Sequence, residues 1–141
     1  MIELIEKIEG EAKLHFHNQS GRVGHVGIEF MHSRGIETML EGKAAPDALV
    51  INPRICGICG HAHLIATAKA LEACYGGFEP SPKAQKLRQM TLDFELILNH
   101  IKWFYLVLYP LFGLKQDIAK VNKLSYTLSK AIALFGGQYP H

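Results

Sequence analysis

Two cysteines three positions apart, Cys56 and Cys59, are the residues of this chain best suited to chemistry. One turn of backbone can present both sulfurs to a single metal ion, and thiolates are ligands that soft metals prefer. Arg54 precedes the pair by two residues, and a neighbouring positive charge favours the thiolate over the thiol. Because soft-metal sites usually need about three or four ligands, the pair requires partners from elsewhere.

The surroundings of the pair leave several interpretations open. A zinc knuckle of Cys56, Cys59, His61 and His63 would place four ligands within eight residues, which leaves little chain to wrap a tetrahedron. A thioredoxin-like redox pair would need a preceding strand and a βαβ context, and incidental or structural thiols are the remaining alternative. With no secretory signal, free thiols or metal ligands are expected rather than disulfides. Cys74 lacks a partner and is expected to be a small buried apolar residue.

Composition places the chain among globular proteins. Its 141 residues suit one compact domain, and a hydrophobic fraction of 48% excludes disorder. A net charge of +2 without a Lys/Arg run predicts no nucleic-acid or anionic-lipid partner. Charged residues within the first ten positions exclude the apolar core of a signal peptide there, so a cytoplasmic location is expected, with membrane association only through partner subunits.

The first third of the chain has the pattern of β-structure. Residues 12–17 and 23–31 alternate between apolar and polar side chains, and residues 18–22 have the composition of a hairpin loop. Beyond Gly35 the pattern changes: residues 36–40 predict a short helical turn, and Pro46 with Asp47 predicts another that ends at Pro53.

Helices are predicted after Cys59. The first covers about residues 60–74 and stops at Gly76-Gly77, and the second starts at Ser81-Pro82 and runs to Leu108. Pro110 and Gly113 break it, and a third covers about residues 116–135. The predicted fold is α+β: a β-rich part, 1–34, with an N-terminal hairpin or small antiparallel sheet, precedes a mostly α-helical bundle, 35–141, as part of a larger subunit.

The stretch 96–112 is apolar almost all round. A membrane span is disfavoured because Asn99, His100 and Lys102 interrupt it and fewer than about 20 apolar residues are available. A helix buried in a larger bundle or in a subunit interface is the preferred interpretation.

A wider window around the cysteines resembles a known motif. The run Arg-x-Cys-Gly-x-Cys-x-x-x-His is similar to the N-terminal metal motif of nickel-iron hydrogenase large subunits, and its residues here are Arg54, Cys56, Gly57, Cys59 and His63. Further segments follow in the family's order: Ile8–Gly10, Arg34–Glu37 with Leu40–Lys43, and Gly136–His141. Lys7 and Glu11 depart from the family pattern, where arginine and histidine are common. The ordered matches extend over essentially the whole chain.

The resemblance implies a nickel-iron centre whose iron carries cyanide and carbon monoxide. By this resemblance Cys56 is a terminal nickel ligand and Cys59 bridges nickel and iron. Soft thiolates suit both metals. His63 would hydrogen-bond the bridging sulfur, a contact that tunes the metals. His61 has no counterpart that we can place in the family and is expected at the surface or in packing.

Two carboxylates also gain roles from the resemblance. Glu9 would take the proton from a nickel-bound cysteine; otherwise it is an exposed charge on an edge strand. Glu37 would bind magnesium, whose hard cation suits a carboxylate oxygen; otherwise it is a solvated charge at a helix start.

The implied function is that of the N-terminal portion of a hydrogenase catalytic subunit, which cleaves dihydrogen heterolytically, in the uptake direction. The implied partners are an iron-sulfur small subunit, the C-terminal remainder of the large subunit and maturation proteins. The family's second cysteine pair lies near the end of a chain several times longer. We therefore expect a truncated or split subunit, inactive alone. The alternatives are a zinc-binding interaction module, a purely structural subunit, and a relative of the quinone-reducing subunit of respiratory complex I, which lacks the nickel thiolates.

Overall fold

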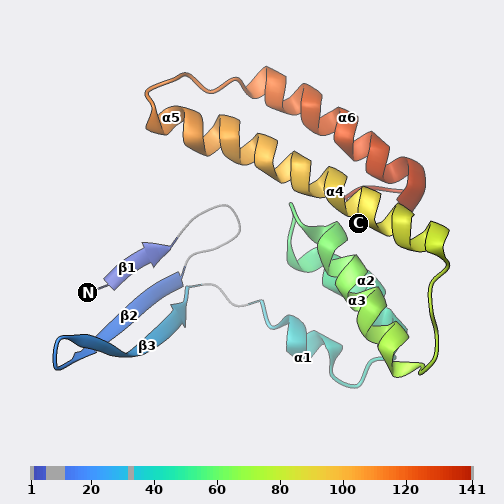
Figure 1. Cartoon of the computed structure of the whole chain (residues 1–141), viewed down its shortest axis with the longest axis horizontal. Coiled ribbons are helices and arrows are strands. Elements are labelled where there is room, and N and C mark those ends of the chain that lie inside the picture. The colour runs from blue at the N-terminus through green and yellow to red at the C-terminus, as the bar shows by residue number, and fades with distance from the viewer. Residues whose placement is uncertain (1, 6–11, 32–33, 141) are drawn as a thin grey trace. The chain divides into compact units, whose positions relative to one another are not determined.

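The structure is a computed structural model that describes residues 2–5, 12–31 and 34–140. The chain divides into two compact units, Met1–Met39 and Leu40–His141 (Figure 1). Each unit is described by itself.

The first unit contains a three-stranded antiparallel sheet in the order β1-β2-β3. Its strands are β1 (Ile2–Ile5), β2 (Ala12–Gln19) and β3 (Arg22–Phe30). A two-residue turn joins β2 to β3, with positive φ angles of 51° at Ser20 and 76° at Gly21, as tight hairpins require. The predicted hairpin is confirmed, but its loop is shorter than the predicted 18–22 because Asn18 and Gln19 pair with Val23 and Arg22.

Short helical segments lead from the sheet to the cysteines. They are α1 (Ile36–Leu40), η1 (Ala45–Asp47), α2 (Ala48–Ile51) and η2 (Asn52–Ile55), of which η1 and η2 are 3-10 helices. The predicted stop near Pro53 holds for the α-helix, since α2 ends at Ile51. Helical backbone continues beyond it, because Asn52 keeps φ −61° and ψ −37° and the 3-10 helix η2 extends to Ile55. Proline fits at this position because the first turn of a helix does not use its missing N–H.

Three longer helices form the rest of the second unit. They are α3 (Gly60–Cys74), α4 (Pro82–Trp103) and α6 (Ile118–Gly136). The predicted cap at Ser81 is confirmed, since its Oγ accepts the Ala84 N–H at 3.3 Å. Asp117 caps α6 in the same way through the Lys120 N–H at 2.9 Å.

The predicted extension of α4 to Leu108 holds as helix but not as α-helix. A π-helical segment, η3 (Phe104–Leu108), follows Trp103, and α5 (Tyr109–Leu111) follows it. Among the described residues, no helix is both long enough and apolar enough to cross a membrane.

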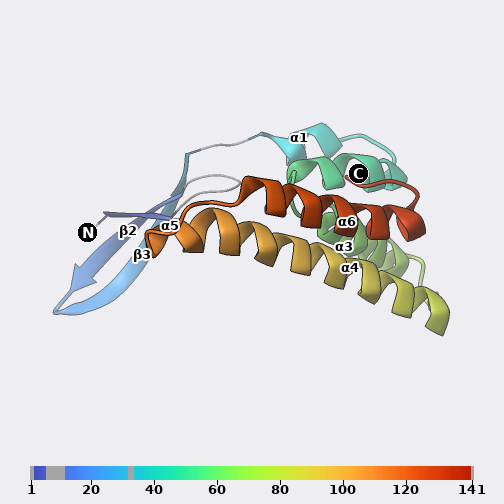
Figure 2. The ribbon, with the colours of Figure 1, turned by 90° about the horizontal axis from the view of Figure 1, so that it is seen from above.

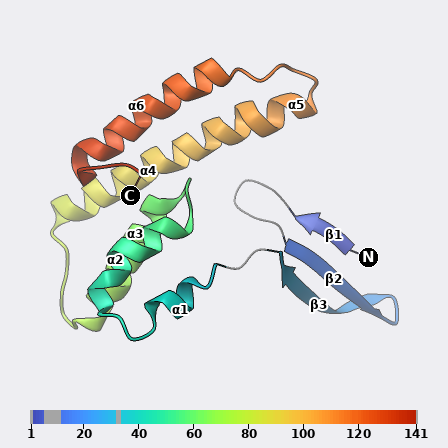
Figure 3. The same cartoon turned by 180° about the vertical axis from the view of Figure 1, so that it is seen from behind.

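The core of the second unit lies where α4 and α6 run side by side (Figures 2 and 3). Leu98, Val121 and Ile132 are buried there, and α3 packs against α4. The outer side of the 96–112 stretch stays exposed, including Leu96, Trp103, Leu111 and Phe112. The predicted fold class, a small antiparallel sheet followed by helices, is confirmed.

Candidate metal centre

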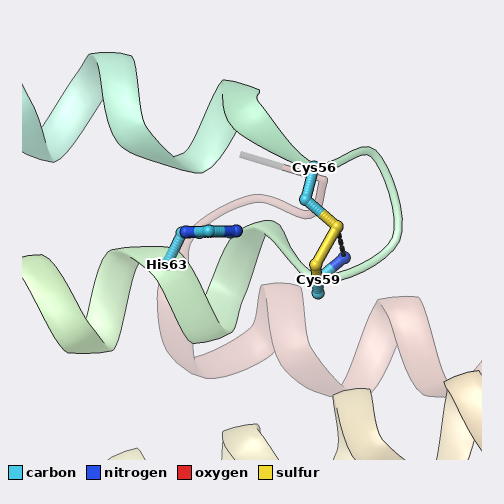
Figure 4. Close-up of side chains that lie close together, drawn as sticks. All are labelled: Cys56, Cys59 and His63. Atoms are coloured by element: carbon cyan, nitrogen blue, oxygen red, sulfur yellow. Dashed lines mark hydrogen bonds between the residues drawn. A yellow bond between two sulfur atoms is a disulfide. The ribbon is translucent and has the colours of Figure 1, made fainter. Parts of the chain in front are cut away.

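The two cysteines flank a short turn between η2 and α3. Cys56 follows η2 with extended backbone angles, and its side chain is buried. Cys59 is the N-cap residue of α3, and its backbone N–H donates to Cys56 Sγ at 3.0 Å (Figure 4). The same N–H would stabilise negative charge on the Cys56 sulfur when it is a thiolate.

His63 joins the cysteines from the first full turn of α3. Its backbone N–H donates to the Cys59 carbonyl at 3.2 Å, and Figure 4 shows its ring directed toward the two sulfurs. One ligand atom from each of Cys56, Cys59 and His63 lies within 4.8 Å of the other two. Two sulfurs and an imidazole nitrogen are a donor set for a soft or borderline metal such as nickel, iron or zinc.

The sulfurs of Cys56 and Cys59 form a disulfide, which differs from the expected free thiols. Their Cα atoms are 5.3 Å apart, a separation that suits a disulfide as well as a shared metal. Because thiolates are the metal-binding form, the two sulfur atoms stand in for thiolates that reduction would release.

Gly60 fixes the approach of η2 to the start of α3. A Cβ atom at Gly60 would lie 2.7 Å from the Pro53 carbonyl oxygen, which is too close for any side chain. The turn that carries the cysteines is therefore held tightly at its base.

Glu95 of α4 anchors the same helix start from the other side. Its side chain is only 1% exposed, and its two oxygens accept the backbone N–H groups of His61 at 2.9 Å and Ala62 at 2.8 Å. The N-terminus of a helix stabilises a negative charge through these N–H groups and the helix dipole. The buried carboxylate thus joins α4 to the residues that follow Cys59.

Tyr139 extends this anchor to the segment after α6. Its hydroxyl donates to Glu95 Oε1 at 3.2 Å. Burial raises the pKa of the Tyr139 phenol above its ordinary value of 10.0, and the neighbouring Glu95 charge raises it further. The hydroxyl therefore remains a hydrogen-bond donor at neutral pH.

His61 packs inside the second unit, which fits one of its two expected roles. It is buried, and its Nε2 lies 2.7 Å from the Thr91 hydroxyl of α4. His61 is not part of the metal-ligand group formed by Cys56, Cys59 and His63. The zinc knuckle that uses all four residues is therefore not assembled.

The remaining predicted site residues are Arg54, Glu37 and Glu9. Arg54 is exposed and lines a hollow of about 410 Å³ with residues of α2, α3 and the Gly136–Gln138 segment. Glu37 is an exposed residue in the first turn of α1, within the first unit. Glu9 lies outside the described residues.

Cys74 corrects another expectation. It is exposed at the end of α3, where its Sγ donates to the Ala70 carbonyl at 3.3 Å, so it is not a buried apolar residue. A cysteine in the last turn of a helix that is followed by two glycines has few neighbouring side chains to cover it.

Sequence reasoning missed Glu95, Thr91 and Tyr139 as supports of the cysteine turn. The sequence pattern did indicate that Glu95 is buried. Thr91, Glu95 and Leu98 recur at positions i, i+4 and i+7 and form the buried stripe of α4. A carboxylate within such a stripe must find hydrogen-bond donors.

Comparison with known proteins identifies the family. The nickel-dependent hydrogenase family matches residues 34–114, a span that contains the cysteine turn and His63. This chain belongs to that family. Its resemblance to the N-terminal portion of a hydrogenase large subunit is thus confirmed.

Two relatives illustrate the similarity, and both are parts of hydrogenases. One belongs to the F420-non-reducing hydrogenase of Methanothermobacter marburgensis and is 38% identical over 120 residues, which cover 82% of this chain and 25% of the relative. The other, the NAD-reducing hydrogenase HoxS subunit beta of Cupriavidus necator, is 28% identical, over 88% of this chain and 27% of that protein. The chain thus spans about a quarter of the length of these relatives.

A solved structure has the same fold. The Ni-Fe-Se hydrogenase from D. vulgaris Hildenborough in the reduced state aligns with all of this chain and 35% of its own, with a TM-score of 0.73 and 25% identity.

Proposed function

We propose that this chain supplies the N-terminal half of the cysteine ligands of a nickel-iron centre in a hydrogenase catalytic subunit. The observation that supports it most directly is the convergence of Cys56, Cys59 and His63 within 4.8 Å, in a chain of the nickel-dependent hydrogenase family. Residues 1–141 would form the N-terminal portion of that subunit.

The donors at the turn fit such a centre. Two thiolates are soft ligands, and a sulfur with several lone pairs can bridge two metals. Cys56 would be the terminal nickel ligand, and Cys59 would bridge nickel and iron. Cys59 stands at the N-terminus of α3, where the helix dipole favours a negatively charged sulfur.

The neighbouring side chains would serve the ligands. His63 would direct a ring N–H to the Cys59 sulfur and so tune its charge. Arg54 would keep positive charge next to the turn, at the edge of the hollow that it lines. Rigid support by Gly60 and Glu95 would keep both sulfurs on the same side of the turn.

When bound, a nickel-iron centre with cyanide and carbon monoxide on its iron would supply heterolytic cleavage of dihydrogen, with uptake as the physiological direction. Glu9 would accept the proton from a cysteine sulfur, as a general base does. Glu37 would hold a magnesium ion through its carboxylate.

Partners would complete the enzyme. The remaining two thiolates would come from the rest of the large subunit, electrons would pass to an iron-sulfur small subunit, and maturation proteins would deliver the metals. We place the enzyme in the cytoplasm, with any membrane attachment made by partner subunits.

Metal analysis tests this function. The protein should be purified together with the products of the neighbouring genes, and its nickel, iron and zinc measured by elemental analysis. Nickel and iron together in the wild type, both lost in Cys59→Ser, are the expected result. Zinc without nickel would overturn the proposal in favour of a zinc-binding interaction module.

A further inference from the structure

The N-cap residue of helix α3 does not cap the helix with its side chain. Cys59 is the N-cap, and its side chain makes no capping hydrogen bond. The first N–H groups of any helix lack partners within the helix, and a Ser, Thr, Asp or Asn side chain at the N-cap normally accepts one of them. Under the proposed function the sulfur of Cys59 belongs to the metals, so the acceptor has to come from elsewhere.

Glu95 provides that acceptor from α4, more than thirty residues away in the sequence. Each of its carboxylate oxygens accepts one N–H, from His61 at 2.9 Å and from Ala62 at 2.8 Å. The carboxylate is 1% exposed, and no lysine or arginine of the described residues forms an ion pair with it. Its negative charge therefore depends on hydrogen-bond donors, and its two backbone donors both lie at the helix start beside the cysteines.

Two further contacts hold the same position. The Tyr139 hydroxyl donates to Glu95 Oε1 at 3.2 Å, and Thr91, one turn before Glu95 on α4, meets the His61 ring at 2.7 Å. Gly60 blocks movement toward η2, because its Cα hydrogen faces the Pro53 carbonyl where a Cβ would lie at 2.7 Å. The start of α3 is thus fixed on both sides, by backbone contact with η2 and by the carboxylate on α4.

We propose that Glu95 is a positioning residue that caps α3 in place of Cys59 and thereby leaves the Cys59 sulfur free, and correctly oriented, for a metal. This inference rests on the proposed function for the identity of the metal site, and on the hydrogen bonds above for the cap. Loss of the carboxylate would let the first turn of α3 fray, and the Cys59 and His63 donors would separate.

The test uses the 141-residue chain with Cys56 and Cys59 reduced, and Ni²⁺ alone as the probe. Glu95→Gln keeps the shape but replaces one acceptor oxygen by an NH₂ group that faces a backbone N–H. We expect faster amide hydrogen exchange at His61 and Ala62, a shifted thiolate-to-nickel absorption band, and Ni²⁺ binding weakened by about 10- to 100-fold, as for other supporting residues around metal ligands.

Glu72→Gln is the matched control. Glu72 is also a carboxylate that joins α3 to α4, through a two-pronged contact with Arg88, but at the other end of α3. This variant should lose stability and yet leave nickel affinity, the absorption band and exchange at His61 unchanged.

The outcomes separate the two proposals. Wild-type exchange and nickel affinity in Glu95→Gln would overturn the positioning role, as would equal weakening by Glu95→Gln and Glu72→Gln, which would mean a general effect of stability. Faster exchange in Glu95→Gln with no Ni²⁺ binding by the wild-type chain would support the cap and overturn the claim that it orients Cys59 for a metal in this chain, while the metal analysis of the purified enzyme decides the metal-binding function separately.

Discussion

The two units of the chain differ in how far they bury their apolar side chains. Among residues 12–31 and 34–39 of the first unit no residue is buried, and Val23, Ile28 and Phe30 on β3 are 54%, 59% and 74% exposed. In the second unit Leu98 and Ile132 are 1% and 0% exposed, and polar groups are buried with them. Backbone hydrogen bonds and cross-strand pairs hold the first unit, whereas a packed core holds the second.

The candidate ligand residues are also divided between the two units. The sulfur and imidazole donors lie in the unit that has its own core, where the turn between η2 and α3 is supported on both sides. Of the two predicted carboxylates, Glu37 is exposed in the first unit, and Glu9 lies outside the described residues. We infer that the cysteine turn is organised within its own unit, and that the proposed roles of the carboxylates depend on the rest of the enzyme.

The largest expected effect is on the thiolates. Cys59→Ser should abolish nickel and iron binding in the purified enzyme, because an alkoxide is a hard ligand that bridges these metals poorly. Cys74→Ser, at the exposed end of α3, should keep both metals and full turnover. Equal metal loss in the two variants, measured by elemental analysis, would show that the cysteines are only structural. The second unit would then no longer be distinguished by metal ligands.

Glu9→Gln should separate proton transfer from metal binding. The amide keeps the shape but cannot titrate, so hydrogen oxidation should fall by at least about 100-fold, as for loss of a general acid–base group, with nickel and iron at wild-type levels. Exchange of deuterium gas with solvent protons should fall as well, while conversion between para- and ortho-hydrogen should persist. Normal solvent exchange with normal metal content would exclude Glu9 as the proton relay.

Leu98→Ala and Ile28→Ala compare the two units directly in the 141-residue chain. The first deletes a fully buried side chain between α4 and α6 and should lower the free energy of unfolding by about 2–5 kcal/mol. The second truncates an exposed strand residue and should change it by less than about 0.5 kcal/mol. Urea denaturation followed by circular dichroism measures both, and similar losses would mean that the first unit has a core of its own.

The smallest effect concerns Tyr139 at high pH. Burial, together with the Glu95 charge, holds the pKa of this phenol above 10.0 in the folded chain. Above that pH the unfolded chain loses a proton that the folded chain keeps, so the free energy of unfolding falls as the pH rises. Below that pH both states keep the proton, so the contribution of this group does not change with pH. Tyr139→Phe should lessen the loss of stability as the pH rises above about 10, as measured by urea denaturation. An unchanged loss would mean that the phenol is not held by Glu95.

Local features were predictable because short segments of sequence encode them. The hairpin followed from alternating residues and a turn sequence, and the Ser81 cap followed from serine before proline at a helix start. The end of η2 was not predicted, because a proline in the first turn of a 3-10 helix is compatible with continued helix. The exposure of Cys74 was also missed, since a sequence does not show which side of a helix end is left uncovered.

The sequence alone determined the spacing that brings Cys56, Cys59 and His63 together, because three residues and then four are one turn of backbone each. It also determined the family, whose match includes that turn. Only the tertiary structure decided how the turn is held. Glu95 reaches His61 and Ala62 across more than thirty residues, and Tyr139 reaches Glu95 from still farther along the chain. Such contacts depend on how α4 packs against α3, and the need of a buried carboxylate for donors does not specify which distant donors will meet it.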